Sequence, residues 1–343
     1  MSNKQNEDKI VLDFFSRYGT PRREIEVVPF KEVFGYAPVN PHGDEVDIYV
    51  ERFKEPHAEL TPAVNEDFVL DREAVSSICG AFLRRRPLMQ TGLPGCGKSE
   101  HVEQIMARLN CELIVLQLTE DTEVSDIIGQ FILKNDETVF VDGPATAGFR
   151  HGYPVLLDEA DYPRPGVMTR ANGFLHGSRM FLESSGKGEG GEVIQRHKDA
   201  TYFGTMNTTG DGDHSISGAM SGTQPQNAAT MTRWRFVEKQ YPSAKDEKSI
   251  IKKACPHALS DYVEILVETL APATRSAASG GELRVPLGTR DLVMMAEIIE
   301  DTNDVRRGFK ECYFNRVGDS TQREALKEIF QRCFDMPLYE EAA

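Results

Sequence analysis

A glycine-rich segment at residues 92–99 has the composition of a phosphate-binding loop. Its sequence, Gly-Leu-Pro-Gly-Cys-Gly-Lys-Ser, matches G-x-x-x-x-G-K-[ST], in which glycines let backbone N–H groups turn toward a phosphate. A helix that begins here would add the positive end of its dipole, about half an elementary charge. Lys98 could then reach the β- and γ-phosphates of ATP and act in catalysis, while the Ser99 hydroxyl ligates Mg²⁺. The expected nucleotide-binding residues are Gly92, Leu93, Pro94, Gly95, Cys96, Gly97, Lys98, Ser99 and Glu100.

Two adjacent carboxylates, Asp158 and Glu159, end a second apolar run. Residues 155–157 before them have the composition of a strand that crosses a core. An acidic pair in this position is often a solvated strand end, but here it follows a phosphate-binding loop at the spacing usual for such folds. We therefore predict that Asp158 and Ser99 hold Mg²⁺ and that Glu159 polarises the attacking water as general base. Asp161 is expected to be structural.

A third apolar run, residues 200–206, would deliver Asn207 to the same end of the sheet. A polar side chain there could orient the lytic water beside the γ-phosphate, so Asn207 is a candidate catalytic residue. The alternative is an asparagine that only turns the chain after a strand.

Apolar periodicity around these residues predicts alternating strands and helices. A helix is expected to begin at Asp71, and the run 111–118 should be a strand buried on both faces. Strands that alternate with helices imply a parallel, three-layer α/β sheet whose ligands gather at the carboxyl ends of the strands. The other expected strands are residues 87–90, 153–161 and 200–208, and the other expected helices are residues 101–110 and 166–177.

Glycine-bearing polar segments at residues 131–143 and 179–195 predict two β-hairpins that project from this core. After Pro242 the strand pattern stops. The expected helices beyond it are residues 245–255, 259–271, 289–301 and 304–314. The predicted parts of the chain are a partly ordered N-terminal extension without sustained periodicity (1–65), an α/β nucleotide-binding domain (66–243) and a smaller all-helical lid (244–343).

Composition restricts the class of protein. With 343 residues and 40% hydrophobic residues the chain can bury the cores of roughly two domains. A net charge of -15 lacks the cationic surface of a dedicated nucleic-acid binder. No segment approaches the roughly 18–20 apolar residues that span a bilayer, and the start lacks a secretory signal, so we expect no membrane and a cytoplasmic location. The scattered cysteines fit reduced thiols.

The order of these motifs resembles the AAA+ ATPases of the MoxR-like group, and most closely the cobaltochelatase ATPase subunits (CobS-like). The resemblance runs from about Phe68 to Arg290. The stretches that carry it are GLPGCGKSEHVEQIMARLN, LLDEAD, HKDATYFGTMNTTGDGD and MTRWRF. It implies a P-loop AAA+ core with hairpin insertions, a helical lid, and an enzyme that hydrolyses ATP.

The resemblance also implies residue roles and partners. Asn207 would be the sensor 1 residue, Arg233 the arginine finger and Arg290 the sensor 2 residue, with Arg235 close enough to compete for the finger role. A surface salt bridge is the alternative for either candidate finger. Because a finger that acts on a neighbour's nucleotide requires an oligomer, a homo-oligomeric ring, usually a hexamer, is implied. Such motors remodel a partner protein or drive a chelatase-like complex with a partner that carries a von Willebrand A domain.

A GTP- or ATP-driven motor acting on DNA is the alternative function. The stretch TMNTTGDGD is similar to the GTP-using restriction motors of the same clade, and Arg84, Arg85, Arg86 and Lys187 would be the DNA contacts. DNA binding is disfavoured, because three arginines before a strand are more often a solvated helix end. A scaffold that binds ATP without hydrolysis is also disfavoured, because such a scaffold is expected to have lost at least one of five residues that are all present here: Lys98, Ser99, Asp158, Glu159 and Asn207.

Overall fold

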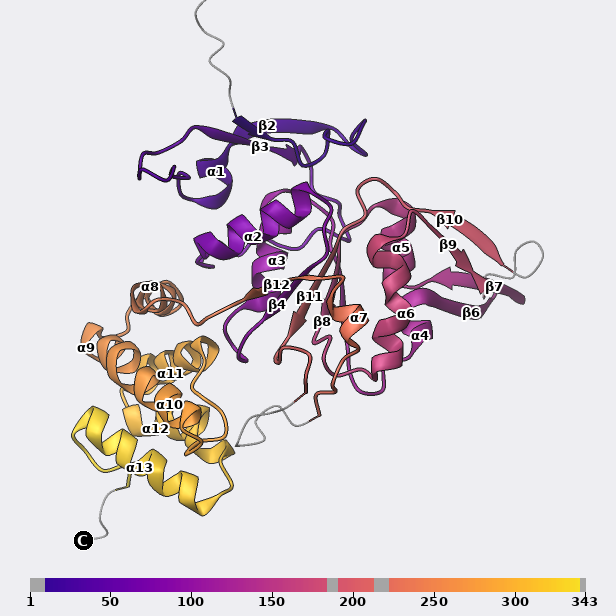
Figure 1. Ribbon diagram of the computed structural model, residues 1–343. Helices are drawn as coiled ribbons and strands as arrows, with labels where there is room; N and C mark the ends of the chain where they lie inside the picture. The colour runs from indigo at the N-terminus through magenta and orange to yellow at the C-terminus, as the bar shows by residue number, and fades with distance from the viewer. Residues whose placement is uncertain (1–9, 184–190, 213–221, 340–343) are drawn as a thin grey trace, which may run out of the picture.

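A parallel sheet of five strands lies at the centre of the computed structural model, which describes residues 10–183, 191–212 and 222–339 (Figure 1). Its strands, in spatial order, are β12 (Arg235–Glu238), β4 (Leu88–Thr91), β11 (Tyr202–Met206), β8 (Val155–Asp158) and β5 (Ile114–Gln117). All neighbouring strands run parallel, so their carboxyl ends meet at one end of the sheet. The predicted parallel α/β sheet is confirmed.

The two edge strands differ from the sequence-based expectation. β5 pairs only with β8 in this sheet, and Val115 on it is 43% exposed. The prediction that segment 111–118 is buried on both faces is therefore wrong, because an apolar run does not reveal whether a strand is central or at the edge. β12 forms the opposite edge and was not predicted, since none of its residues is buried and its pattern is not that of a core strand.

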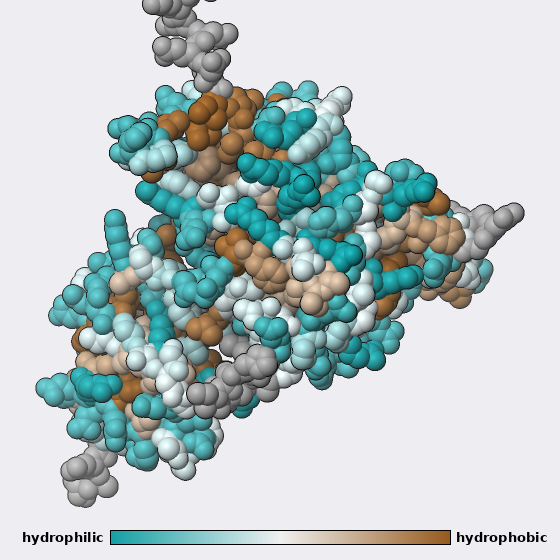
Figure 2. Space-filling view, viewed as in Figure 1, coloured by the Kyte–Doolittle hydropathy of each residue, from teal (hydrophilic) through white to brown (hydrophobic). Residues whose placement is uncertain are grey.

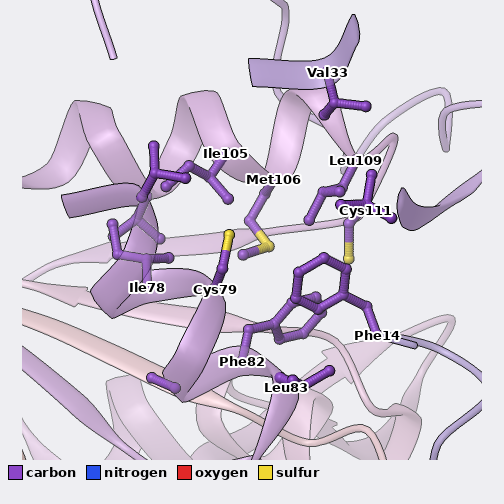
Figure 3. Packing of buried hydrophobic residues seen from close by; sticks show 14 of the residues in the cluster. Phe14, Val33, Ile78, Cys79, Phe82, Leu83, Ile105, Met106, Leu109 and Cys111 are labelled. Atoms are coloured by element: carbon purple, nitrogen blue, oxygen red, sulfur yellow. The ribbon is translucent and has the colours of Figure 1, made fainter. Parts of the chain in front are cut away.

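Helices cover both faces of the sheet (Figure 1). They are α2 (Arg72–Leu83) and α3 (Lys98–Arg108) on one face, and α4 (Val124–Ile128), α5 (Pro144–His151) and α6 (Pro165–His176) on the other. Asp71 caps α2 by accepting the N–H of Ala74 at 2.8 Å, which satisfies one of the free donors of the first turn. Ile78 and Phe82 of α2 pack with Met106 of α3 in the core of that face (Figure 3). The predicted helices at Asp71, 101–110 and 166–177 are confirmed.

Residues 10–53 form a small mixed sheet that the sequence did not predict. Its order is β1 (Ile10–Leu12), β3 (Ile48–Phe53) and β2 (Ile25–Pro29), with α1 (Phe30–Phe34) directly after β2. Phe15 packs on Phe53 with ring centroids 4.0 Å apart and on Phe82 of α2 at 5.8 Å. The predicted partly ordered extension thus contains strands that the sequence did not reveal, because tertiary contacts rather than local periodicity hold them. Apolar side chains also gather on the outside near this sheet (Figure 2), where Ile10 and Val27 are exposed.

Both predicted hairpins are confirmed as antiparallel pairs. They are β6 (Gly129–Lys134) with β7 (Glu137–Asp142), and β9 (Arg179–Leu182) with β10 (Glu192–Gln195). Arg150 of α5 links them, since its guanidinium pairs with Asp142 at 2.7 Å and with Glu192 at 3.0 Å. Lys187, the suggested DNA contact, lies outside the described residues.

The chain after β12 is helical, as predicted. Its helices are α8 (Ala244–Ala254), α9 (Ser260–Ile265), a π-helical turn (Leu266–Leu270), α10 (Ala271–Ser279), α11 (Thr289–Thr302), α12 (Val305–Cys312) and α13 (Ser320–Phe334). They surround a hydrophobic cluster of their own, in which Phe309 and Phe330 lie 4.9 Å apart. α13 was not predicted. In the described part of the chain, no helix is long and apolar enough to cross a membrane.

Candidate nucleotide-binding and catalytic site

The glycine-rich loop connects β4 to α3 at the carboxyl end of the sheet. Gly97 precedes α3 with φ +84°, and Gly92 has φ +153°, where a Cβ would lie 2.2 Å from the Lys239 carbonyl oxygen. A side chain at either position would strain or block the loop, so these glycines are required by its geometry. The turn leaves the first N–H groups of α3 directed out of the helix, which is the arrangement that binds phosphate.

Lys98 lies inside this loop, with only 8% of its surface exposed. Its ammonium donates to the carbonyl oxygens of Gly92 at 2.7 Å and Leu93 at 3.2 Å, and to Oδ1 of Asn207 at 2.9 Å. Burial lowers the pKa of Lys98, and nearby negative charges oppose that shift. The structure thus brings together two residues that the sequence places far apart, one from the loop and one from the end of β11. A cleft of about 630 Å³ opens beside them.

Asp158, at the end of β8, receives two short hydrogen bonds. Ser99 Oγ and Thr205 Oγ1 each donate to Asp158 Oδ1 at 2.5 Å. The hydroxyl and carboxylate oxygens of Ser99 and Asp158 form a hard-oxygen donor set, which fits Mg²⁺. Thr205 was missed as a functional residue, although its place at the end of the same strand as Asn207 was a usable signal.

Glu159 leaves the strand in a left-handed conformation, with φ +58°. Its N–H donates to Thr205 Oγ1 at 3.0 Å, which supports this turn. Partial burial, and then the negative charge of Asp158, raise the pKa of Glu159, while a hydrogen bond with the Gln117 side chain lowers it. Gln117 was also missed, because its contact arises only from the pairing of β5 with β8, in which Gln117 lies opposite Asp158.

Asp161 is fully buried and fixes the backbone after β11. Its Oδ2 accepts the N–H groups of Asn207 at 2.9 Å and Thr208 at 2.8 Å. Tyr162 shares a hydrogen bond with the Asn207 side chain. The turn after β8 therefore sets the position of Asn207, in agreement with the structural role expected for Asp161.

The C-terminal helices contact the loop through Gly288, the residue before α11. A Cβ on Gly288 would lie 3.3 Å from the Pro94 carbonyl oxygen and 3.4 Å from the Gly95 Cα. The Tyr241 hydroxyl donates to the same Pro94 oxygen at 3.0 Å. Arg290, the second residue of α11, is exposed at this junction.

Arg233 and Arg235 lie at the other end of the sheet. The N–H of Arg235 donates to the Pro87 carbonyl at the start of β4, whereas the phosphate-binding loop follows the end of β4. Arg233 comes just after α7 (Ala228–Met231), and its guanidinium donates to the Ala229 carbonyl. The structure therefore does not bring either arginine to the Lys98 site of the same chain.

Known proteins are similar to this chain in sequence. The model of the AAA domain (dynein-related subfamily) matches residues 87–221. The aerobic cobaltochelatase subunit CobS of Sinorhizobium sp is 30% identical over 327 residues, covering 92% of this chain and 93% of that protein. Protein CbbQ of Hydrogenophilus thermoluteolus is 29% identical over 50% of this chain and 59% of its own length. Protein NorQ of Paracoccus denitrificans is 35% identical over 31% of this chain and 39% of its own length.

The chain belongs to the MoxR-like AAA+ ATPases. It is therefore a nucleotide-binding enzyme that hydrolyses ATP, and the resemblance derived from its motifs is confirmed.

Proposed function

We propose that this ATPase assembles into a homo-oligomeric ring, a hexamer, and uses ATP hydrolysis to remodel a partner protein or to drive a chelatase-like complex. The observation that carries the proposal is the convergence of Lys98, Ser99, Asp158, Glu159 and Asn207 at the carboxyl end of one sheet. A protein that only bound ATP would need neither a general base such as Glu159 nor a polar side chain such as Asn207 beside the phosphate-binding loop.

Residues 92–100 would bind the triphosphate, with Lys98 placing its charge on the β- and γ-phosphates. In the bound state Lys98 would exchange its contacts with the loop carbonyls for phosphate oxygens. Ser99 and Asp158 would hold Mg²⁺, which supplies charge neutralisation at the β- and γ-phosphate oxygens when bound.

Glu159 would act as general base. It takes a proton from the attacking water, while the water oxygen bonds to the γ-phosphorus and the bond from that phosphorus to the β–γ bridging oxygen breaks. The raised pKa of Glu159 brings its basicity closer to that needed at neutral pH. Asn207 would orient the water and respond to the presence of the γ-phosphate, because its side chain already contacts Lys98.

Arg290 would sense the γ-phosphate in the same subunit, because α11 begins against the loop. Arg233 would serve as the arginine finger for a neighbouring subunit, since it lies far along the sheet from its own phosphate site. Arg235 remains the competing candidate. A finger supplied by a neighbour makes the ring a requirement for full turnover.

The partner we propose is a protein with a von Willebrand A domain, as the family resemblance implies. The cobaltochelatase subunit CobS, a relative over nearly its whole length, supports a chelatase-like complex. We also propose a cytoplasmic location and three functional parts of the chain, an extension (1–65), a nucleotide-binding domain (66–243) and a lid (244–343).

The test is turnover of ATP and GTP by the full chain, measured together with its mass in solution with and without nucleotide. We expect ATP hydrolysis that rises with nucleotide-dependent ring formation and is unchanged by DNA. Glu159→Gln should retain nucleotide, stay assembled and lose turnover by about 10²- to 10⁴-fold. A preference for GTP, or turnover only with DNA, would contradict the proposal.

A further inference from the structure

Four arginines without carboxylate partners gather at the amino end of the sheet, near the edge strand β12. They are Arg84, Arg86, Arg233 and Arg235, and we call them the arginine patch. Over the described ranges none of the four forms an ion pair, and the side chains of Arg84 and Arg233 donate only to carbonyls of their own helices. Arg85, by contrast, is turned inward and pairs with Asp199 at 3.1 Å.

Members of the arginine patch lie close to one another. A Cβ on Gly80 would lie 3.6 Å from Arg84 Nη1 and 3.9 Å from Arg235 Nη1, so both guanidinium groups cover the same point of α2. Two guanidinium groups that both lie within 4 Å of one point repel each other unless an anion lies beside them. Such a cluster is unexpected on a chain whose net charge is -15.

The other two members, Arg86 and Arg233, lie at the same end of the sheet, because Arg86 directly precedes Pro87, whose carbonyl accepts the N–H of Arg235 at 3.0 Å. Burial, and then positive charges that include those of Arg86 and Arg233, lower the pKa of His176. The arginine patch is thus one cationic surface built from the residues after α2, the segment just after the end of α7 and the start of β12.

A run of carboxylates lies at the opposite corner of the sheet. Residues 120–126, which we call the acidic turn, follow the edge strand β5 at its carboxyl end. Its exposed carboxylates are Glu120, Asp121, Glu123 and Asp126. In the parts of the chain that the structure describes, none of them pairs with a cation. The acidic turn begins beside the end of β8, since the N–H of Leu118 donates to the Asp158 carbonyl at 2.9 Å.

We propose that the arginine patch of one subunit docks on the acidic turn of a second copy of this chain. The two surfaces have opposite charge and lie at opposite edges and opposite ends of one sheet, so each subunit offers both at once. A contact between different surfaces of identical subunits is heterologous, and it closes into a ring when its rotation allows. This inference rests on the proposed ring and adds the interface that builds it.

The docking explains why Arg233 lies far from its own phosphate site. The acidic turn is joined directly to β5, whose last residue lies opposite Asp158. An arginine patch on that turn brings Arg233 to the end of the neighbour's sheet where the phosphate-binding loop lies. Complementary charge across an interface mainly fixes orientation and speeds association, which is what placement of a finger requires.

Phosphates of a nucleic acid could also attract these arginines. The second copy is favoured because the same chain carries an unpaired acidic surface of matching charge, and because the surface as a whole repels polyanions.

The test reverses each surface in the full chain, leaving Arg233 unchanged. One variant is Arg84→Glu/Arg86→Glu, the second is Glu120→Arg/Asp121→Arg, and the third combines all four changes and keeps the net charge of the natural chain. The readout is mass in solution by sedimentation velocity with ATP and Mg²⁺, over a range of protein and salt concentrations. Binding of a fluorescent ATP analogue by each variant verifies that it is folded.

We expect either single reversal to raise the protein concentration needed for assembly by roughly tenfold or more. Assembly should return in the combined variant. It should also return when the two reversed variants are mixed. The intact arginine patch of one variant then faces the intact acidic turn of the other, and the two reversed surfaces, which also have opposite charge, face each other. As a matched control, Lys245→Glu/Lys252→Glu changes the charge of exposed lysines on α8 by the same amount and should assemble normally.

Normal assembly of both reversed variants, or no recovery on mixing or combination, would overturn the interface while leaving the ring in place. DNA binding by the natural chain that disappears in Arg84→Glu/Arg86→Glu while assembly persists would assign the patch to nucleic acid. A natural chain that hydrolyses ATP as a monomer would overturn both the ring and its interface.

Discussion

The buried carboxylate of Asp161 holds Asn207 in place, accepting its backbone N–H at 2.9 Å. The side chain of the same asparagine accepts a hydrogen bond from Lys98 at 2.9 Å. Asn207 is therefore fixed from two sides, by the turn after β8 and by the phosphate-binding loop. Its position therefore depends on both the carboxylate strand and the loop.

Replacement of Asp161 by alanine should displace Asn207. It leaves the partly buried N–H groups of Asn207 and Thr208 without their acceptor, at a cost of up to about 1–3 kcal/mol each in the free energy of unfolding. We expect kcat to fall by about 100-fold, because a small misplacement of a catalytic group is enough for that loss. The ATP dissociation constant should change little.

The matched comparison is Asn207→Ala alone and together with Asp161→Ala. If Asp161 acts through Asn207, the double variant should lose no more kcat than the worse single variant. Losses that simply multiply would show that the two residues act independently.

The pH dependence of kcat should report on Gln117. Turnover requires ionised Glu159, so kcat rises as pH passes upward through the pKa of that carboxyl group. The Gln117 hydrogen bond lowers this pKa. Gln117→Leu should therefore shift the acidic limb of the kcat profile to higher pH, whereas Val115→Ala on the same strand should leave it in place. If the acidic limb of the kcat profile stays in place in Gln117→Leu, a group other than Glu159 controls that limb.

A methyl group at Gly288 should weaken the contact between the lid and the loop. Its Cβ would lie 3.3 Å from the Pro94 oxygen and 3.4 Å from Gly95 Cα, which are backbone atoms with little freedom to move. Overpacking typically costs about 1–3 kcal/mol, so Gly288→Ala should bind ATP roughly tenfold more weakly. The control is Gly166→Ala in α6, where no atom lies within 4 Å of the new Cβ. Equal ATP-binding curves for Gly288→Ala and Gly166→Ala would show that the contact between Gly288 and the loop does not contribute to ATP binding.

The N-terminal sheet should contribute to the stability of the nucleotide-binding domain. Phe15 is 1% exposed and packs on both Phe53 and Phe82. Phe15→Ala should lower the free energy of unfolding by about 3–5 kcal/mol, measured by chemical denaturation. Val27→Ala, at an exposed position, should change it by less than about 0.5 kcal/mol. An unchanged midpoint for Phe15→Ala would show that the N-terminal sheet unfolds separately.

Sequence reasoning placed residues correctly where they are contiguous in the chain, while their roles in binding and catalysis stay predictions. The loop at residues 92–99 and the pair Asp158–Glu159 are set by local glycine geometry and by a strand end, so spacing alone predicts them. It failed where position depends on tertiary pairing. The contact of Gln117 with Glu159 depends on strand order, and the N-terminal sheet depends on packing against α2. For α13, by contrast, Leu326, Ile329 and Phe330 lie at helical spacing, so a usable signal was present.

The most direct test of the central account mixes two inactive variants. Glu159→Gln subunits lack the base but keep Arg233, and Arg233→Ala subunits keep the base but lack the finger. In a ring with fingers supplied by neighbours, an Arg233→Ala site beside a Glu159→Gln subunit is complete. Random mixing at equal amounts makes such sites about a quarter of the total, so turnover should recover to roughly a quarter of that of the natural chain. Turnover of the mixture equal to the mean of the two variants would contradict the account, because it would mean that Arg233 does not complete a neighbour's site.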